Sequence, residues 1–273
     1  MSTVGETVTG EKDFYKLRYS AEAATLQDRI FAEVDPGYFG QGSWTSTADY
    51  DRLFDGLEVG PEHVVLDIAS GGGAPALRLA ERRRCRVVGI DRSDDAVATA
   101  TRRAGERGLS ERVTFKAADA TARLPFDDGH VDAVISVDGL IHLPNRPAVL
   151  AEWARVVKRG GRLAFTDQIV TAPIMNTELA IRSPDFPFLI TMPGYNEAQL
   201  ALAGFHLKRR EDLTETIAGL ACRHWQARER HRDALIALEG QARFDQLTAY
   251  RRMAETLATE RRLSHVAFWA ERG

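Results

Sequence analysis

The side chains of this chain best suited to bind a ligand are three acids, of which two follow short apolar runs directly and the third follows a short alternating run. The acids are Asp67 after residues 64–66, Asp91 after residues 87–90, and Asp119 after residues 113–116. Such runs are typical of buried parallel strands, and an open α/β sheet places its ligands at the carboxyl ends of its strands. Because a carboxylate there accepts hydrogen bonds from both hydroxyls of a ribose, the pattern predicts a nucleoside-bearing cofactor.

A run of three glycines, residues 71–73, follows the first acid. Glycine lets the backbone turn sharply and approach a ligand closely, because it has no Cβ. Two residue patterns, each typical of a different nucleoside-bearing cofactor, fit this turn. Gly71 and Gly73 with Ala76 satisfy the dinucleotide fingerprint, and Asp91 lies near the distance that it expects. The alternative is a pattern of one acid followed by small residues at every second position, which Asp67, Ala69, Gly71 and Gly73 satisfy.

The elements that must position these residues can be read along the chain. The sequence predicts a strand over 131–137, a helix over about 146–158, a turn at Gly160–Gly161 and a strand over 162–166. A glycine pair suits a helix stop followed by a strand start. Two further strands are predicted on either side of a largely helical stretch: residues 205–211, which follow Ala203 and Gly204, and residues 264–271, where apolar residues alternate.

In order and spacing, these motifs resemble the class I S-adenosylmethionine-dependent methyltransferases over roughly residues 50–170. In that family the glycine turn lies against the methionine part of the cofactor, and the acids after the second and third strands bind its ribose and adenine. The resemblance implies the following cofactor-binding residues: Asp67, Ala69, Gly71, Gly73, Asp91, Arg92, Asp119, Ala120 and Val137. Two positions depart from the family pattern, Ala69 where glycine is usual and Arg159 where proline is usual.

The resemblance implies an α/β fold, with a Rossmann-like, seven-stranded, mostly parallel sheet and helices on both faces. We expect residues 1–62 to form an N-terminal helical lid segment, with helices near residues 14–34 and 47–57. We expect residues 63–273 to form the cofactor-binding domain, with a helical cap at about 215–262 inserted before the last strand.

A second, shorter resemblance concerns the catalytic residues. Asp138 and His142 lie four positions apart, so a helical turn would place them on one face. Their segment looks similar to one in phosphoethanolamine-type and sarcosine/dimethylglycine-type N-methyltransferases, and residues 38–46 look like the lid of the phosphoethanolamine enzymes. The resemblance implies that His142 works with Tyr38, with Asp138 beside them. A histidine is suited to accept the proton that a methyl acceptor loses, since its pKa lies near neutrality.

Composition excludes several other classes of function. A net charge of −3 gives the chain no positive electrostatic field that would attract nucleic acid. The sequence has no run of 18 apolar residues, so no membrane span is predicted. The start of the chain has no apolar signal core, and two cysteines, Cys85 and Cys222, offer no disulfide framework. We therefore expect a cytoplasmic protein without a membrane partner. No cluster of Cys, His or acidic residues indicates a metal, and the oligomeric state stays open between a monomer and a homodimer.

The sequence thus predicts an enzyme that transfers a methyl group from S-adenosylmethionine to a small-molecule acceptor and releases S-adenosylhomocysteine. Nitrogen, oxygen and carbon acceptors of a metabolite or natural-product intermediate all remain open, with an amine slightly favoured. One alternative is an enzyme that binds S-adenosylmethionine but catalyses a cyclisation or rearrangement without methyl transfer. The other is an NAD(P)-dependent oxidoreductase, although no Tyr-x-x-x-Lys pair follows to carry its proton transfer.

Overall fold

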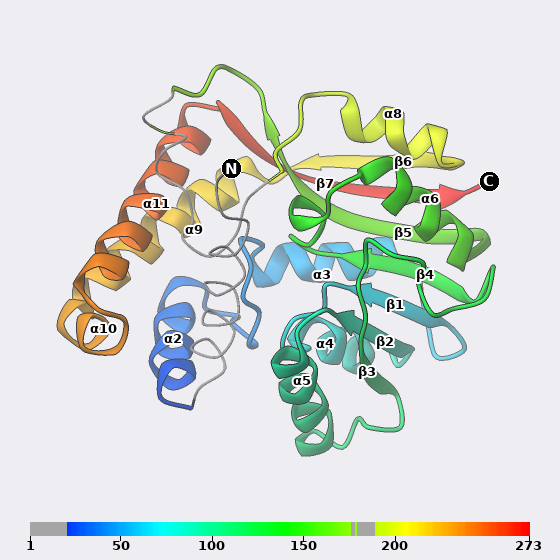
Figure 1. The fold of residues 1–273 in the computed structure, drawn as a ribbon, viewed down its shortest axis with the longest axis horizontal. Coiled ribbons are helices and arrows are strands. Elements are labelled where there is room, and N and C mark those ends of the chain that lie inside the picture. Colours follow the sequence, from blue (N-terminus) through cyan, green and yellow to red (C-terminus); the bar gives the residue numbers. More distant parts are fainter. Residues whose placement is uncertain (1–20, 176–177, 179–188) are drawn as a thin grey trace, which may run out of the picture.

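The protein is built on one seven-stranded sheet with helices on both faces (Figure 1). A computed structural model describes residues 21–175, 178 and 189–273. The strands are β1 Val64–Ile68, β2 Arg86–Asp91, β3 Val113–Ala117, β4 Val131–Ser136, β5 Val157–Val170, β6 Phe205–Asp212 and β7 Leu263–Arg272. The helices are α2 Ala21–Val34, α3 Thr47–Gly56, α4 Ala74–Arg83, α5 Asp94–Glu106, the short η1 Leu140–His142, α6 Arg146–Val156, α8 Tyr195–Leu202, α9 Thr214–Arg230, α10 Arg232–Glu239 and α11 Gln241–Thr259.

The order of the strands across the sheet is β3-β2-β1-β4-β5-β7-β6. The first five strands run parallel, and β7 runs antiparallel to both of its neighbours, β5 and β6. The parallel strands are short apolar runs because helices cover both of their faces. The prediction of a mostly parallel, seven-stranded α/β sheet is confirmed.

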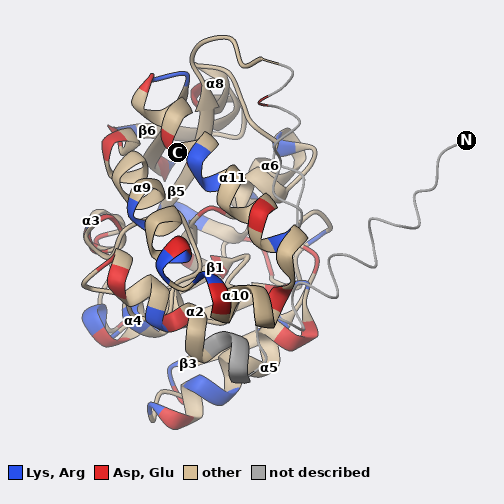
Figure 2. Cartoon of the chain, turned by 90° about the vertical axis from the view of Figure 1, so that its left-hand side faces the viewer, with Lys and Arg blue, Asp and Glu red and all other residues tan. Residues whose placement is uncertain are grey.

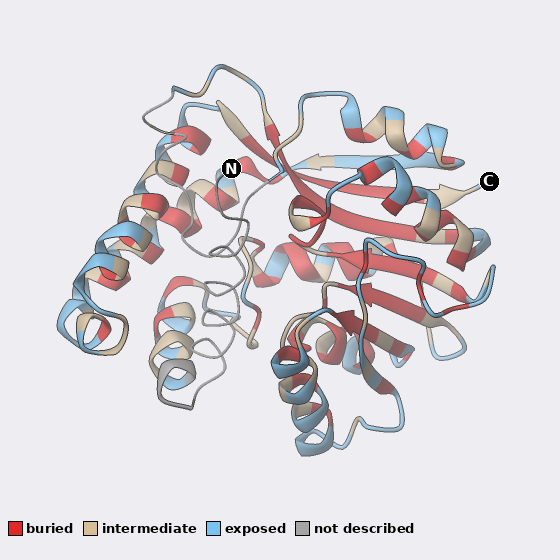
Figure 3. Ribbon diagram, viewed as in Figure 1, coloured by how far each residue is buried: buried red, intermediate tan, exposed pale blue. Residues whose placement is uncertain are grey.

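Two apolar layers form the core, one on each face of the sheet (Figure 3). On one face, Trp153 of α6 packs against Phe165 of β5, which stacks on Phe268 of β7 with 4.8 Å between ring centroids. On the other face, Phe54 of α3 and Leu77 of α4 pack on the same strands. Both faces of the central strands are thus sealed from water, and their open ends remain for ligands.

A third apolar cluster joins α2 to the helices between β6 and β7. Ile30 and Val34 of α2 pack with Leu220 of α9 and Phe244 of α11, and Arg223 of α9 donates a hydrogen bond to the carbonyl of Val34 (2.7 Å). Figure 1 shows α2, α9, α10 and α11 grouped together beside the sheet. The stretch 215–262 is helical, as predicted. Residues 14–20 of the helix expected near 14–34 lie outside the described residues.

The predicted turn at Gly160–Gly161 is wrong. Both glycines lie inside β5, which is 14 residues long and begins at Val157, directly after α6 ends at Val156. Val157 already pairs with Val131 of β4, and the register shifts before Ala133, where the pairing resumes at Arg162. The glycines therefore allow an irregularity within a strand, with φ of +73° at Gly160, rather than a connection before it.

Lysine, arginine and acidic residues are interspersed on the face seen in Figure 2. The arginine-rich stretch at residues 82–84 follows this pattern, because Arg82 and Arg83 pair with Asp55 of α3 at 3.3 and 3.0 Å. In the described part of the chain, no helix combines the length and apolar composition needed to cross a membrane.

Candidate active site

A cleft of about 450 Å³ opens at the carboxyl ends of β1, β2 and β4. Ten of the residues predicted from the sequence line it: Asp67, Ala69, Gly71, Asp91, Arg92, Asp119, Ala120, Val137, Asp138 and His142. The opposite wall comes from α2, the segment between α2 and α3, α9 and α11, and includes Phe31, Trp44, His224, Tyr250 and Arg251. The fold therefore gathers residues far apart in the chain around one cavity.

Asp91 joins the glycine turn to the start of α5. One of its oxygens, Oδ2, accepts a hydrogen bond from the amide of Gly71, and Oδ1 accepts one from the amide of Ser93, each at 2.9 Å. The N-cap of α5 is Ser93, whose hydroxyl accepts from the amide of Ala96, so Asp91 is not engaged in capping. Its carboxyl is buried at the edge of the cleft, which raises its pKa.

The buried carboxyl of Asp67 has one oxygen atom that no described residue hydrogen-bonds. This oxygen, Oδ2, is enclosed. Burial, and then the nearby charge of Asp91, raise the pKa of Asp67 to about 8. A buried carboxylate without a partner is costly. A ligand that brought a positive charge or an N–H donor to this point would remove that cost, so Asp67 matches a cationic cofactor.

We expect the stability of the ligand-free protein to fall as pH rises between about 4 and 8. The folded protein keeps a proton on Asp67 that the unfolded chain loses near pH 4, so the stabilisation is complete below that pH and is lost as pH approaches 8. The slope due to Asp67 is up to about 1.4 kcal/mol per pH unit. Urea unfolding at several pH values measures it. Asp67→Asn, which carries no titrating proton, removes this slope; an unchanged slope in that variant would refute the assignment.

Gly73, predicted to bind the cofactor, is not among the residues that line the cleft, and its contact with the cofactor remains a prediction. It is the N-cap of α4 with φ of +79°, and a Cβ on it would lie 2.6 Å from Cζ of Phe115 and 2.7 Å from Cβ of Ala100. Packing therefore requires a glycine here, whereas Gly71 lines the cleft itself. Ala69 has φ of +60°, a conformation that side chains disfavour, which explains why glycine is usual at this position of the family pattern.

Asp119 lies at the rim of the cleft and is exposed. Its Oδ1 accepts hydrogen bonds from the amide and the hydroxyl of Thr121, at 2.8 and 2.7 Å, and these bonds lower its pKa. The carboxylate therefore stays ionised at neutral pH. One of its oxygens is left to accept from a ligand amine.

The predicted helical turn from Asp138 to His142 is wrong. Asp138 has a left-handed backbone, with φ of +53°, and only residues 140–142 form a short 3₁₀ turn. The Asp138 carboxylate instead accepts hydrogen bonds from the amide of Trp44 (2.8 Å), the hydroxyl of Thr45 (3.3 Å) and the hydroxyl of Thr166 (2.8 Å). Nε2 of His265 lies 3.4 Å from Oδ1 of Asp138.

Asp138 thus links the N-terminal segment to strands β5 and β7. Thr45, Thr166 and His265 are three functional candidates that the sequence did not reveal. Each stands on a different element, and the buried network exists only once the sheet has formed, so no spacing along the chain signals it.

Of the predicted pair of Tyr38 and His142, only His142 is among the described residues that line the cleft. Tyr38 stacks on Phe31, with 5.3 Å between ring centroids, and donates its hydroxyl proton to Asp28. Phe31 and Asp28 are the neighbours of Tyr38 that line the cleft. A direct action of Tyr38 with His142 on a substrate remains a prediction.

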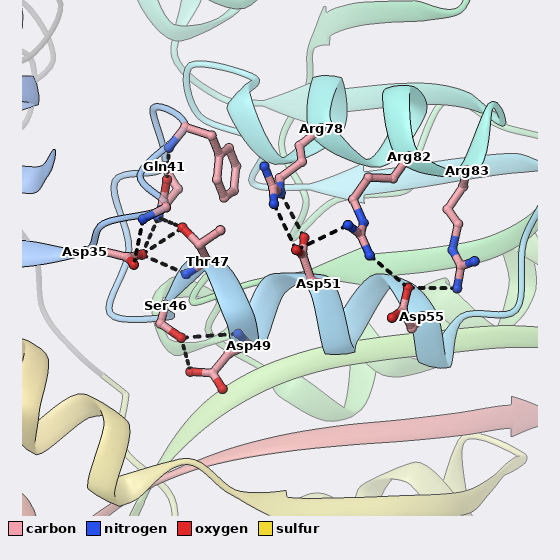
Figure 4. Close-up of polar contacts among 12 residues, drawn as sticks. Asp35, Gln41, Ser46, Thr47, Asp49, Asp51, Asp55, Arg78, Arg82 and Arg83 are labelled. Carbon is pink, nitrogen blue, oxygen red and sulfur yellow. Dashed lines mark hydrogen bonds and ion pairs between the residues drawn. The ribbon is translucent and has the colours of Figure 1, made fainter.

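A set of ion pairs and hydrogen bonds fixes the segment that carries Trp44 and Thr45 (Figure 4). Asp35 accepts from the amide and hydroxyl of Thr47, at 2.7 and 2.8 Å, and from Gln41 at 3.0 Å. Helix α3 is in turn tied to α4, where Arg78 donates two hydrogen bonds of 2.8 Å to Asp51. The wall of the cleft opposite the glycine turn is therefore anchored to the sheet through α3 and α4.

Comparison with known proteins places this geometry in context. Residues 66–165 match the family model described as a methyltransferase domain. The 27-O-demethylrifamycin SV methyltransferase of Amycolatopsis mediterranei is 37% identical over 53% of this chain and 54% of its own length. Phosphoethanolamine N-methyltransferase 3 of Arabidopsis thaliana is 27% identical over 81% of this chain and 43% of its own. The chain spans about half the length of the curated relatives it matches.

Among solved structures, the cyclopropane synthase MmaA2 of Mycobacterium tuberculosis superposes with a TM-score of 0.82. The alignment covers 100% of this chain and 99% of the synthase at 18% identity. At that identity the likeness shows a shared fold. It extends beyond the matched domain and includes the helices between β6 and β7.

Proposed function

We propose that the protein transfers a methyl group from S-adenosylmethionine to a small-molecule acceptor, since residues 66–165 match the family model described as a methyltransferase domain. The observation that carries the proposal is the single cleft that brings together Asp67, Asp91 and Asp119 at the ends of three neighbouring strands. The names of the relatives describe enzymes that methylate small molecules, at oxygen in the rifamycin case and at nitrogen in the phosphoethanolamine case.

The described residues match the chemical groups of this cofactor. We assign Asp91 to the ribose hydroxyls, Asp119 to the adenine amino group, and the partnerless carboxyl of Asp67 to the positively charged methionine end. The cofactor supplies an electrophilic methyl group on a sulfonium. The protein positions the reacting groups and excludes water, since Phe31, Trp44 and Tyr250 form the wall opposite the glycine turn.

His142 is our candidate for the base that takes the proton from the acceptor, because it lines the cleft beside Val137 and Asp138. We assign Asp138 a positioning role, since it fixes Trp44 and Thr45. Tyr38 remains the proposed partner of His142, which requires its hydroxyl to leave Asp28. We also propose that the protein works in the cytoplasm, where its free cysteines, Cys85 and Cys222, stay reduced.

Calorimetric titration with S-adenosylhomocysteine, and separately with NADH, tests the proposal. We expect S-adenosylhomocysteine to bind with one site per chain and NADH to give no heat of binding. Binding of NADH alone would overturn the cofactor assignment. Incubation with methyl-labelled S-adenosylmethionine and a panel of acceptors then separates methyl transfer, which labels a product, from a cyclisation, which changes the substrate and leaves the label in the cofactor.

A further inference from the structure

A second cavity, which we call the apolar pocket, adjoins the cleft and has a volume of about 130 Å³. It lies where β5, β7, α9 and α11 meet the segment after β5. Most of its wall is hydrocarbon, from Ile174, Ile190, Ile217, Met253, Leu257 and Leu263. Filling an apolar cavity with an apolar ligand group is favourable, since that group leaves water.

The apolar pocket and the cleft share a wall made of Trp44 and Tyr250. Their rings meet edge to face with 5.7 Å between centroids. The main chain of Trp44 is fixed, because its amide donates to Asp138 at 2.8 Å. These two rings therefore separate the apolar pocket from the cleft that Asp138 and His142 line.

The side chain of Gln168 makes no hydrogen bond to another described residue, and Nδ1 of His265, which also lines this pocket, has no partner there either. Gln168 lies on β5, opposite His265 of β7, and is only 4% exposed. A buried amide costs free energy unless it is hydrogen-bonded. The amide of Gln168 is therefore available to an oxygen-bearing ligand in the pocket, either as donor or as acceptor.

The pocket offers no net charge from its described lining. Glu178 reaches it, but Arg262 donates to both of its carboxylate oxygens, at 2.6 and 2.5 Å, and the amide of Met175 donates at 2.8 Å. An acid satisfied in this way does not attract a further cation strongly. The amine acceptor slightly favoured by the sequence therefore has no counter-charge in this pocket.

The volume of the pocket indicates the size of a group that would fill it. An engineered protein cavity of roughly 150 Å³ lined by aliphatic side chains binds one benzene molecule, so a cavity of about 130 Å³ takes a ring-sized group. We propose that the apolar pocket binds an uncharged, ring-sized hydrocarbon portion of the methyl acceptor, with one oxygen function on the Gln168 amide. This inference rests on the proposed function and names the substrate class of the same site.

Binding of three small probes to the protein saturated with S-adenosylhomocysteine tests the inference. The probes are p-cresol, toluene and benzylamine, which is a cation at pH 7, measured by calorimetry. We expect p-cresol to bind with one site per chain, and benzylamine to bind at least about tenfold more weakly, because it loses hydration without gaining a counter-charge. Equal or tighter binding of benzylamine would overturn the assignment to an uncharged group.

Two variants and one control variant test whether the probe binds in the apolar pocket. Gln168→Leu is expected to weaken p-cresol about fivefold, the value of one neutral hydrogen bond, and to leave toluene unchanged or tighter. Ala254→Phe fills the pocket from α11 and is expected to abolish binding of both, whereas Ala242→Phe, at an exposed position of the same helix, leaves both unchanged. If p-cresol binds Gln168→Leu as it binds the wild type, the inference fails, whether or not Ala254→Phe folds.

The titration with S-adenosylhomocysteine separates this inference from the function on which it rests. If S-adenosylhomocysteine does not bind, the proposed function itself fails. If it binds but p-cresol does not, only the assignment of the apolar pocket is wrong.

Discussion

Replacing Asp91 with alanine is expected to weaken the binding of S-adenosylhomocysteine by about 100-fold or more. The carboxylate is assigned to the ribose hydroxyls, and it also fixes the glycine turn through the amide of Gly71 at 2.9 Å. The variant loses both functions at once. A hydrogen bond to a charged group contributes about 1.5–3 kcal/mol, and about 2.7 kcal/mol corresponds to a 100-fold change in affinity.

Calorimetry on the wild type and three variants measures the effect. Asp91→Asn keeps the shape of the side chain but loses its charge, so we expect an intermediate affinity. Asp95→Ala makes the same change at an exposed position of α5 outside the cleft and should bind like the wild type. Since burial raises the pKa of Asp91, its removal is not expected to unfold the protein. Wild-type affinity in Asp91→Ala would show that the ribose does not lie there.

Replacing Arg146 with methionine is expected to lower the free energy of unfolding by about 3–5 kcal/mol. Arg146 and Asp167 form a buried ion pair, with side chains 5% and 0% exposed. Arg146 also donates to Asn196 at 3.2 Å and to the carbonyl of Leu189. Without the guanidinium, Asp167 keeps hydrogen bonds from Asn196 and Thr191 but remains a buried charge without a counter-ion.

Urea unfolding of the purified variants measures this loss. Arg159→Met removes an exposed arginine from β5 and is the matched control, with an expected change below about 0.5 kcal/mol. The double variant Arg146→Met, Asp167→Asn removes both charges and should recover part of the stability, because the cost comes from the charge left behind. A loss below about 1 kcal/mol in Arg146→Met would show that Asp167 finds another compensation.

The sheet could be predicted because its information is local. Apolar runs such as residues 64–68 can only be buried strands in this setting, and the acids at their ends meet at one edge whenever the strands run parallel. Asp91 and Asp119 therefore reached the cleft as predicted. The length of β5 was not visible, because two glycines inside a strand look the same as two glycines in a turn until the partner strand is known.

The rest of the site depends on contacts between distant elements. The left-handed backbone of Asp138 is held by Trp44, Thr45 and Thr166, which no helical periodicity around residues 138–142 could reveal. Gly73 shows a further limit of local patterns, because the space that requires a glycine there is filled by Phe115 of β3, 42 positions later. The spacing of the motif does not reveal this packing requirement, and a contact of Gly73 with the cofactor remains a prediction.

The position of β7 has a consequence for how the protein is made. β7 lies between β5 and β6 in the sheet, although it follows both in the chain. While the ribosome is still adding residues 213–262, β6 has no neighbour to pair with and one edge of β5 is open. Unpaired strand edges invite association between chains. The side of the cleft that carries the glycine turn can form from β1 to β4 early in synthesis, whereas its opposite wall must wait for α9 and α11, and the apolar pocket for residues 263–265. A nascent chain stalled in the helical insertion is thus expected to be the species most prone to aggregate.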